Sequence, residues 1–199
     1  KSNGVHDIIL VERNIYMLDY MRISEEYRYK TELHAHTKPV SLCSEITPEE
    51  IVRAYYEYGC DTLTVTNHLN PDWTPSRTDE YLSGYYDTKK AAEGTGMNVV
   101  LGVEIRFTEN ANDYLVYGVS FGDIEKMIRL IPYGITEFYK EIKTRENIIL
   151  QAHPFRNGMT LAPLDSIDGI ETFNMHPGHN SRVAVACRYA AEHSLLVSG

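Results

Sequence analysis

Two histidines, His34 and His36, stand two positions apart at the end of a strand-like run, YKTELHAHTKP (residues 29–39). Residues i and i+2 of a strand face the same side, roughly 7 Å apart, so the two imidazoles can converge on one object between them. An isolated His-x-His is more often a pair of ordinary surface or core histidines. The rest of the chain must therefore show whether further ligands join them.

Further metal-ligand residue types follow other strand-like runs. His68 follows LTVTN, Glu104 follows VLGV and His153 follows IILQA. The carboxyl ends of barrel strands open at one mouth, where active sites assemble. Imidazoles with a carboxylate suit Zn, Mn or Fe. The sequence therefore predicts a transition-metal site whose ligands are His34, His36, His68, Glu104 and His153.

The elements that position these residues show a βα rhythm from residue 29 onwards. Residues 47–59 (TPEEIVRAYYEYG) predict a helix, with a capping box of Thr47 and Glu50, Pro48 at its first turn and Gly59 at its end. Strands are predicted at residues 28–34, 61–68, 98–105, 113–121, 147–154, 168–174 and 195–199, and further helices at 78–96, 135–147 and 181–194. The run NVVLGVEI is typical of a buried parallel strand.

This alternation predicts an α/β fold with a parallel sheet or barrel. Residues 1–28 contain short apolar runs broken by charges and predict an N-terminal extension with an edge strand or hairpin. Residues 29–199 show no internal repeat or linker, and they predict one domain.

Composition narrows the function classes. The 199 residues include 19 Lys+Arg and 28 Asp+Glu, a formal net charge of −9, and no basic patch that would indicate nucleic-acid binding. An acidic surface repels anions, so a phosphate site here needs its own local positive charge. No apolar run reaches the ~20 residues of a membrane span. Three cysteines without a C-x-x-C pair (Cys43, Cys60 and Cys187) favour a reducing compartment, and we predict a cytoplasmic protein.

Four segments in order, ELHAHT, GCDTLTVTNHLN, VVLGVEI and QAHPFR, resemble the successive motifs of the PHP (polymerase and histidinol phosphatase) family of metal-dependent phosphoesterases. The resemblance covers about residues 30–199. It implies a distorted (β/α)7 TIM-like barrel with metals at its mouth. By motif, it makes the four histidines metal ligands and Glu104 a bridging carboxylate, and it places Glu104 and His68 at the catalytic centre.

The chain departs from the family pattern at three places. The loop TKPVSLCSEITPEE has no acidic residue or histidine in register, so Cys43 either replaces that ligand, contacts substrate or only packs. Asn67 stands where the family has an acid that orients the following histidine. DYLVYGV lacks a histidine that some members carry, which favours fewer metals, from one to three.

Two residues are predicted to contact substrate. Arg156, three positions after His153, can make a bidentate contact to a phosphate, although it can also be a solvated loop residue. His176 follows ETFN, a stretch that borders the substrate in the family, whereas His179 is expected to cap the next helix.

The predicted activity is hydrolysis of a small phosphomonoester or nucleotide by metal-activated water. No G-x-S-x-G, P-loop or G-x-G-x-x-G motif points to another chemistry. One alternative is an amidohydrolase, whose barrel also begins with His-x-His but commonly bridges its metals with a lysine. The other is a degenerate PHP module that binds metal or ligand without catalysis.

The C-terminal run EHSLLVSG opens one more strand. In the resembling family this strand leads into a Gly-Ser-Asp-x-His segment that completes the metal site. We therefore expect the catalytic domain to continue past Gly199. We also expect the 199 residues to bind metal but to show weak phosphatase activity until that segment is restored.

Overall fold

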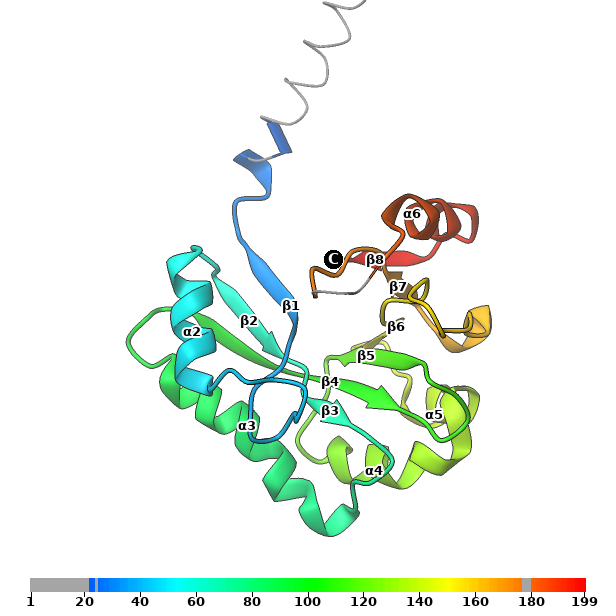
Figure 1. Ribbon diagram of the computed structural model, residues 1–199, viewed down its shortest axis with the longest axis horizontal. Coiled ribbons are helices and arrows are strands. Elements are labelled where there is room, and N and C mark those ends of the chain that lie inside the picture. Colours follow the sequence, from blue (N-terminus) through cyan, green and yellow to red (C-terminus); the bar gives the residue numbers. More distant parts are fainter. Residues whose placement is uncertain (1–21, 24, 177–179) are drawn as a thin grey trace, which may run out of the picture. The chain divides into compact units, whose positions relative to one another are not determined.

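The computed structural model describes residues 22, 23, 25–176 and 180–199 (Figure 1). The chain divides into two units, Lys1–Lys30 and Thr31–Gly199. In the first unit, residues 22, 23, 25 and 26 are helical, and the Tyr27 N–H donates to the Ile23 carbonyl at 2.8 Å. The edge strand or hairpin predicted for residues 1–28 falls mainly on residues 1–21, which lie outside the described residues.

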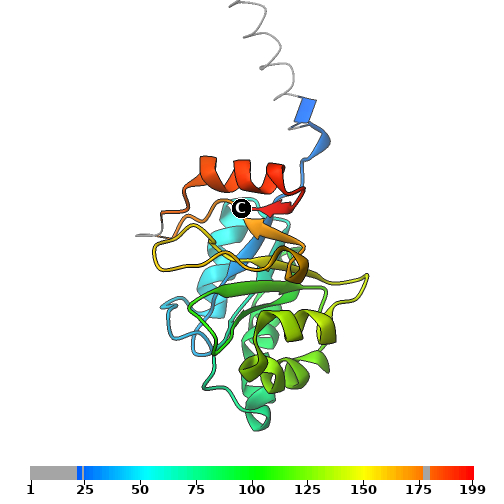
Figure 2. The ribbon, with the colours of Figure 1, turned by 90° about the vertical axis from the view of Figure 1, so that its right-hand side faces the viewer.

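The second unit is built on one eight-stranded sheet with the order β1-β2-β4-β5-β6-β7-β8, and β3 pairs with β4. The strands are β1 (Thr31–Ala35), β2 (Thr62–Val65), β3 (His68–Leu69), β4 (Asn98–Arg106), β5 (Asp113–Tyr117), β6 (Ile148–Gln151), β7 (Gly169–Glu171) and β8 (Leu196–Ser198). The α-helices of this unit are α2 (Pro48–Glu57), α3 (Thr78–Ala91), α4 (Asp123–Leu130), α5 (Gly134–Ile142) and α6 (Val183–Glu192). Helix α3 packs against β2 and β4, and α6 packs against β7 and β8 (Figures 1 and 2).

The sheet is parallel at both ends and antiparallel in the middle. Strand β4 runs parallel to β2, as predicted, but β5 is antiparallel to both β4 and β6. A short connection over residues 107–112 joins β4 to β5 without a helix, which breaks the βα rhythm. The result is an α/β fold with a curled half-barrel sheet, and the seven-unit barrel count is not confirmed.

Helix boundaries follow local chemistry. At α2 the predicted capping box is confirmed: the Glu50 N–H donates to Thr47 Oγ1 at 3.3 Å, and the Thr47 N–H donates to Glu50 Oε2 at 2.9 Å. The helix ends before Gly59, whose φ of 72° suits a residue without a side chain. Helix α4 lies after β5 where the sequence pattern predicted no helix.

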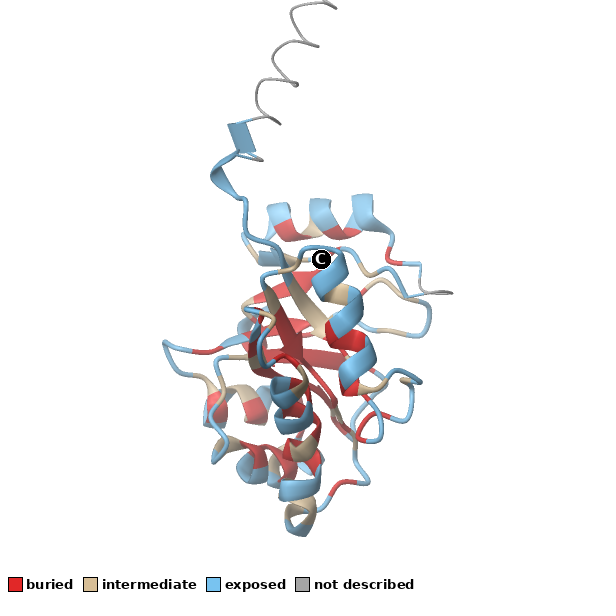
Figure 3. Cartoon of the chain, turned by 90° about the vertical axis from the view of Figure 1, so that its left-hand side faces the viewer, coloured by how far each residue is buried: buried red, intermediate tan, exposed pale blue. Residues whose placement is uncertain are grey.

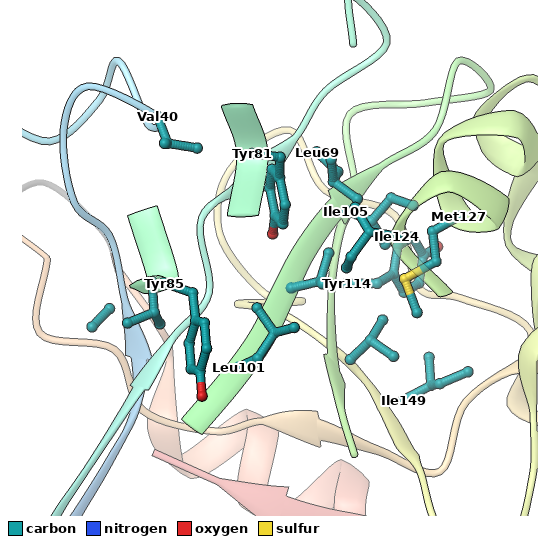
Figure 4. Close-up of a cluster of buried hydrophobic side chains, with 14 of the residues drawn as sticks. Val40, Leu69, Tyr81, Tyr85, Leu101, Ile105, Tyr114, Ile124, Met127 and Ile149 are labelled. Carbon is teal, nitrogen blue, oxygen red and sulfur yellow. The ribbon is translucent and has the colours of Figure 1, made fainter. Parts of the chain in front are cut away.

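The core lies between the sheet and the helices that cover it (Figure 3). Tyr114 and Ile149 from the sheet pack with Ile124 and Met127 of α4 (Figure 4). Within the described residues, no helix combines the length and apolar character needed to cross a bilayer. The packing of apolar side chains between helices and sheet holds the strand ends in fixed positions.

Candidate metal centre

A buried carboxylate, Glu104, forms the middle of a histidine cluster at the strand ends. Its Oε1 atom lies 3.3 Å from His34 Nε2 and 3.3 Å from His153 Nε2. Its Oε2 atom lies 3.2 Å from His36 Nε2 and 2.9 Å from His68 Nδ1. Glu104 is 1% exposed, so the four imidazoles replace water around it. All five residues predicted to be metal ligands are therefore brought together.

The strands deliver these side chains by register. His68 begins β3 and pairs directly with Glu104 on β4. Thr66 and Asn67 lie between β2 and β3 and belong to neither strand. His34 lies in β1, and His36 follows that strand. His34 and Glu104 lie near the ends of β1 and β4, His36 and His153 follow β1 and β6, and His68 begins β3. The five side chains therefore reach the same edge of the sheet.

The cluster has the features of a cation site. Glu104 Oε2 and His68 Nδ1 are buried and have no hydrogen-bond partner among the described residues, so their 2.9 Å approach lacks the angles of a hydrogen bond. Ligand atoms of His34, His36 and Glu104 lie within 4.8 Å of one another. Buried polar atoms without partners are costly, and a cation between them would satisfy them. Nitrogen and carboxylate ligands of this kind suit Zn, Mn or Fe.

The ionisable groups of the cluster shift one another's pKa values. Burial lowers the pKa of His68, but the Glu104 carboxylate and Cys43 outweigh it and raise that pKa to about 10. Burial also lowers the pKa of His34, yet Glu104 and Glu171 raise it well above 6.5. Burial raises the pKa of Glu104, but the neighbouring His34 and His68 hold it well below 4.5. Without a cation, protons on the imidazoles balance the carboxylate, and metal binding must displace them.

The stability of the metal-free protein should therefore fall as pH rises. His34 and His68 have raised pKa values in the folded state, so their contribution is complete below 6.5 and is lost as pH rises through the folded values, about 10 for His68. His36 has the opposite effect on the free energy of unfolding, because burial lowers its pKa and favours the neutral ring. Urea unfolding of chelator-treated protein at about pH 6 and about pH 9 measures this change. An equal or greater free energy of unfolding at the higher pH would contradict it.

Glu171 supports two of the histidines and was not among the predicted site residues. Its Oε1 atom lies 2.8 Å from His34 Nδ1, and its Oε2 atom accepts the His153 N–H at 2.9 Å. Asn174 donates to the same Oε1 atom at 3.1 Å. A carboxylate on the second nitrogen of an imidazole fixes the ring and its tautomer. The stretch ETFN did indicate a border of the site, but no spacing in the sequence links residue 171 to residue 34.

Replacing Glu171 with Gln should weaken metal binding without unfolding the protein. The amide keeps the shape of the side chain but loses the charge that orients His34, and such losses cost about 10–100-fold in metal affinity. A competition titration with a chromophoric chelator measures this change. Glu146→Gln, on an exposed position, serves as the matched control. Unchanged affinity in Glu171→Gln would show that His34 is oriented by other contacts.

Asp113 is a second carboxylate that the strand-end pattern missed. It begins β5, but because β5 runs antiparallel, that beginning lies beside the end of β4. Asp113 is buried, and Arg106 donates to its Oδ1 and Oδ2 atoms at 2.7 Å each. Its Oδ2 atom lies 3.7 Å from His153 Nε2 and 3.6 Å from Arg156 Nη2. The predicted substrate residue Arg156 thus lies at the edge of the metal centre, with its side chain 22% exposed.

Asn67 organises the loop that follows β1. Its Oδ1 atom accepts the Thr37 N–H at 2.8 Å and the Ser41 hydroxyl at 2.9 Å, while Nδ2 donates to Thr37 Oγ1 at 3.1 Å. Ser41 Oγ in turn accepts the His68 N–H at 2.9 Å. The Asn67 amide therefore helps to position the His68 backbone, because Ser41 bonds to both. An acid at this position could not make the Nδ2 donation.

Gly84 of α3 makes room for Asn67. A Cβ atom at residue 84 would lie 2.4 Å from Asn67 Nδ2. Gly84→Ala should therefore destabilise the protein by about 1–3 kcal/mol, because overpacking outweighs the ~1 kcal/mol gain in helix propensity. Thermal unfolding measures the effect. Gly122→Ala is the control, because its Cβ would come no closer than 3.9 Å to a neighbour. Equal stability of Gly84→Ala and the parent would contradict the crowding.

The other two predicted substrate contacts differ in position. Cys43 is exposed in the loop after β1, and its Sγ atom lies within 4.8 Å of ligand nitrogens of His36 and His68. His176 is exposed after β7, and its N–H donates to Asn174 Oδ1 at 2.9 Å. His176 belongs to none of the ligand groups found among the described residues. His179 lies in the stretch 177–179, outside the described residues.

A carboxylate shared by four imidazoles at the strand ends of a half-barrel sheet is a cluster that could hold a metal ion in an α/β protein. The PHP domain family model matches residues 32–196, and the chain belongs to this family. The resemblance seen in the sequence motifs is thus confirmed. A comparison with curated protein sequences finds no match.

Solved structures show the same fold at low sequence identity. A protein from Bifidobacterium adolescentis, whose metal-dependent phosphoesterase activity is itself inferred, aligns with a TM-score of 0.58 and 16% identity over 86% of each chain. A two-domain protein from Bacteroides vulgatus, with an inferred PHP-like metal-dependent phosphoesterase domain, aligns with a TM-score of 0.63 and 18% identity over 85% of this chain and 50% of that one. An amidohydrolase from Chromobacterium violaceum, solved with sulfate and no metal, aligns with a TM-score of 0.53 and 12% identity over 85% and 86%.

Proposed function

We propose that this PHP domain is a metal-dependent phosphoesterase that hydrolyses a small phosphomonoester or nucleotide. The observation that carries the proposal is the position of Glu104, which has two imidazoles on each oxygen and an arginine, Arg156, at the edge of the same cluster. His34, His36, His68, Glu104 and His153 would hold one to three divalent ions. Zn, Mn or Fe in such a site supplies Lewis acidity and lowers the pKa of water.

The chain's own residues would bind and orient the substrate. The Arg156 guanidinium can donate to phosphate oxygens and stabilise negative charge that develops on them. Its loop is tied at the backbone, because the Arg156 N–H donates to the His153 carbonyl at 3.0 Å. Arg182 holds the same loop by donating to the Phe155 carbonyl and, at 2.6 Å, to Asn157 Oδ1. A loop held in one conformation reduces the entropy that is lost when its arginine binds a ligand.

Local charge matters because the protein carries a formal net charge of −9. Arg106 and Arg156 together carry two positive charges against the single charge of Asp113, so the two guanidinium groups supply local positive charge at this edge of the cluster. This favours a compact anion such as a phosphate monoester over a polyanion, which the acidic surface would repel.

An amidohydrolase is the main rival, and a solved amidohydrolase shares the fold. The central carboxylate here is a glutamate, and its ion-pair partners among the described residues are histidines, with no lysine. Glu104 therefore favours phosphoester chemistry. The third possibility is a module that binds metal or ligand without catalysis. Asn67 stands where the family has an acid, but its side chain still holds the loop after β1, and the histidine cluster stays together.

Metal analysis with parallel turnover assays tests the proposal. Protein purified without added metal should contain a first-row transition metal, and turnover of p-nitrophenyl phosphate and of nucleoside monophosphates should exceed turnover of matched amides. The assays should include a chain extended beyond residue 199. Preferred amide hydrolysis would favour the amidohydrolase. Bound metal without turnover in either chain would favour the binding module.

A further inference from the structure

The two oxygens of Glu104 face chemically different surroundings. On the Oε1 side, the groups near the two imidazoles are carboxylates: Glu171 contacts His34, and Asp113 lies near His153. On the Oε2 side a sulfur is present as well, because Cys43 joins His36 and His68 with all three ligand atoms within 4.8 Å of one another. The Asp113 carboxylate reaches both sides, since it also lies within 4.8 Å of ligand atoms of His68 and Glu104. The centre therefore has an oxygen-rich half and a sulfur-containing half.

The turn that carries Cys43 is tied to both histidine-bearing segments. The Ser44 N–H donates to the Ser41 carbonyl at 3.0 Å, which closes the turn over residues 41–44. Ser44 Oγ donates to the His36 carbonyl at 3.0 Å, and Ser41 Oγ accepts the His68 N–H at 2.9 Å. Leu42, the other central residue of the turn, is 95% exposed. The two serines on either side of Cys43 thus place the thiol by contacts that do not involve the thiol itself.

The two histidines on this side have nitrogens that lack partners. Nδ1 of His36 and Nδ1 of His68 are both buried without a hydrogen bond among the described residues. Their rings stack with centroids 4.5 Å apart and planes 13° apart. Two imidazoles and a thiolate form a three-ligand set with an open position, which suits Zn²⁺ and related thiophilic ions better than Mn²⁺.

We infer that Cys43, His36 and His68 form a soft metal subsite in which the Cys43 thiolate is a direct ligand. The thiol loses its proton to solvent when the metal–sulfur bond forms, so no oxidant or reductant is needed. This inference rests on the metal-dependent function proposed above and adds that the centre discriminates between ions. The sulfur-containing half takes Zn²⁺ or Co²⁺, whereas the oxygen-rich half accepts Mn²⁺.

Cobalt substitution tests the subsite by spectroscopy rather than by activity. Chelator-treated protein is titrated with Co²⁺ alone, and a thiolate-to-cobalt charge-transfer band in the near ultraviolet is recorded beside the visible ligand-field bands. We expect the charge-transfer band in the parent protein and its complete loss in Cys43→Ser. Cys60→Ser and Cys187→Ser are matched controls on the other two cysteines, and both should keep the band.

The possible outcomes separate this inference from the proposed function. Ligand-field bands without a charge-transfer band in the parent, or a band that survives in Cys43→Ser, would overturn the soft subsite but leave the histidine centre in place. Failure of Co²⁺ to bind at all would overturn both. Cys43→Asp guards against misfolding of the serine variant, because it should bind Co²⁺ with the parent stoichiometry but without the band.

Thiol protection gives an independent measurement on the unaltered protein. Zn²⁺ should slow alkylation of Cys43 by iodoacetamide at least about tenfold, since the thiolate is the reactive form and the metal would occupy it. Mn²⁺ should have little effect. Cys187, which is also exposed, reports the general reactivity of thiols in the same sample by peptide mass spectrometry. Equal alkylation of Cys43 with and without Zn²⁺ would contradict direct ligation.

Discussion

Glu104→Gln should remove most metal binding and lower phosphomonoester turnover by about 10³-fold or more. Glu104 supplies the only carboxylate that all four imidazoles approach within 3.3 Å in the described structure. The amide has the same shape but carries no charge, and it places an NH₂ group against imidazole nitrogens. Metal catalysis is worth several kcal/mol, and each 1.36 kcal/mol is about a factor of ten in rate.

Metal content per chain and calorimetric titration with Zn²⁺ measure the first effect, and p-nitrophenyl phosphate turnover measures the second. Glu125→Gln, in an exposed pair with Arg129 on α4, is the control for loss of a carboxylate. Circular dichroism establishes that the variant folds. If Glu104→Gln retained the full metal stoichiometry and affinity, Glu104 would not be the bridging ligand.

Arg156→Ala should weaken phosphate binding and turnover by about 10²-fold while leaving the metal content unchanged, in line with the loss of one preorganised charged donor. The guanidinium cannot bind a cation, and it lies 3.6 Å from Asp113 at the edge of the cluster. Its removal therefore separates substrate binding from metal binding. Arg156→Lys should recover only part of the effect, because an ammonium cannot make a bidentate contact.

Calorimetric binding of inorganic phosphate to the metal-loaded protein measures this loss without requiring turnover. Arg129→Ala, which removes an exposed arginine from α4, is the matched control. Phosphate affinity in Arg156→Ala equal to that of the control would assign Arg156 to a purely structural contact with Asp113. A loss of metal in the same variant would mean that Asp113 needs Arg156 to keep its position.

The five candidate metal ligands could be picked out from the sequence because the position of each depends on local order. A strand fixes which side its residues face, and His34, His36, His68, Glu104 and His153 each end or follow an apolar strand-like run. The start of α2 was also readable, since a capping box requires only residues 47 and 50. Family membership followed from four such local segments in order, and the match over residues 32–196 confirms it.

The supporting residues were decided only by the tertiary structure, because their roles depend on contacts between distant segments. Asp113 reaches the centre because β5 runs antiparallel, and strand direction is set by pairing with β4 and β6 rather than by the sequence of β5 itself. Glu171 meets His34 across 137 positions of chain. Cys43 lies near the histidines because Ser44 and Ser41 tie its loop to the backbone of His36 and His68. Local patterns specify which side chains a strand presents, whereas long-range packing decides which of them meet.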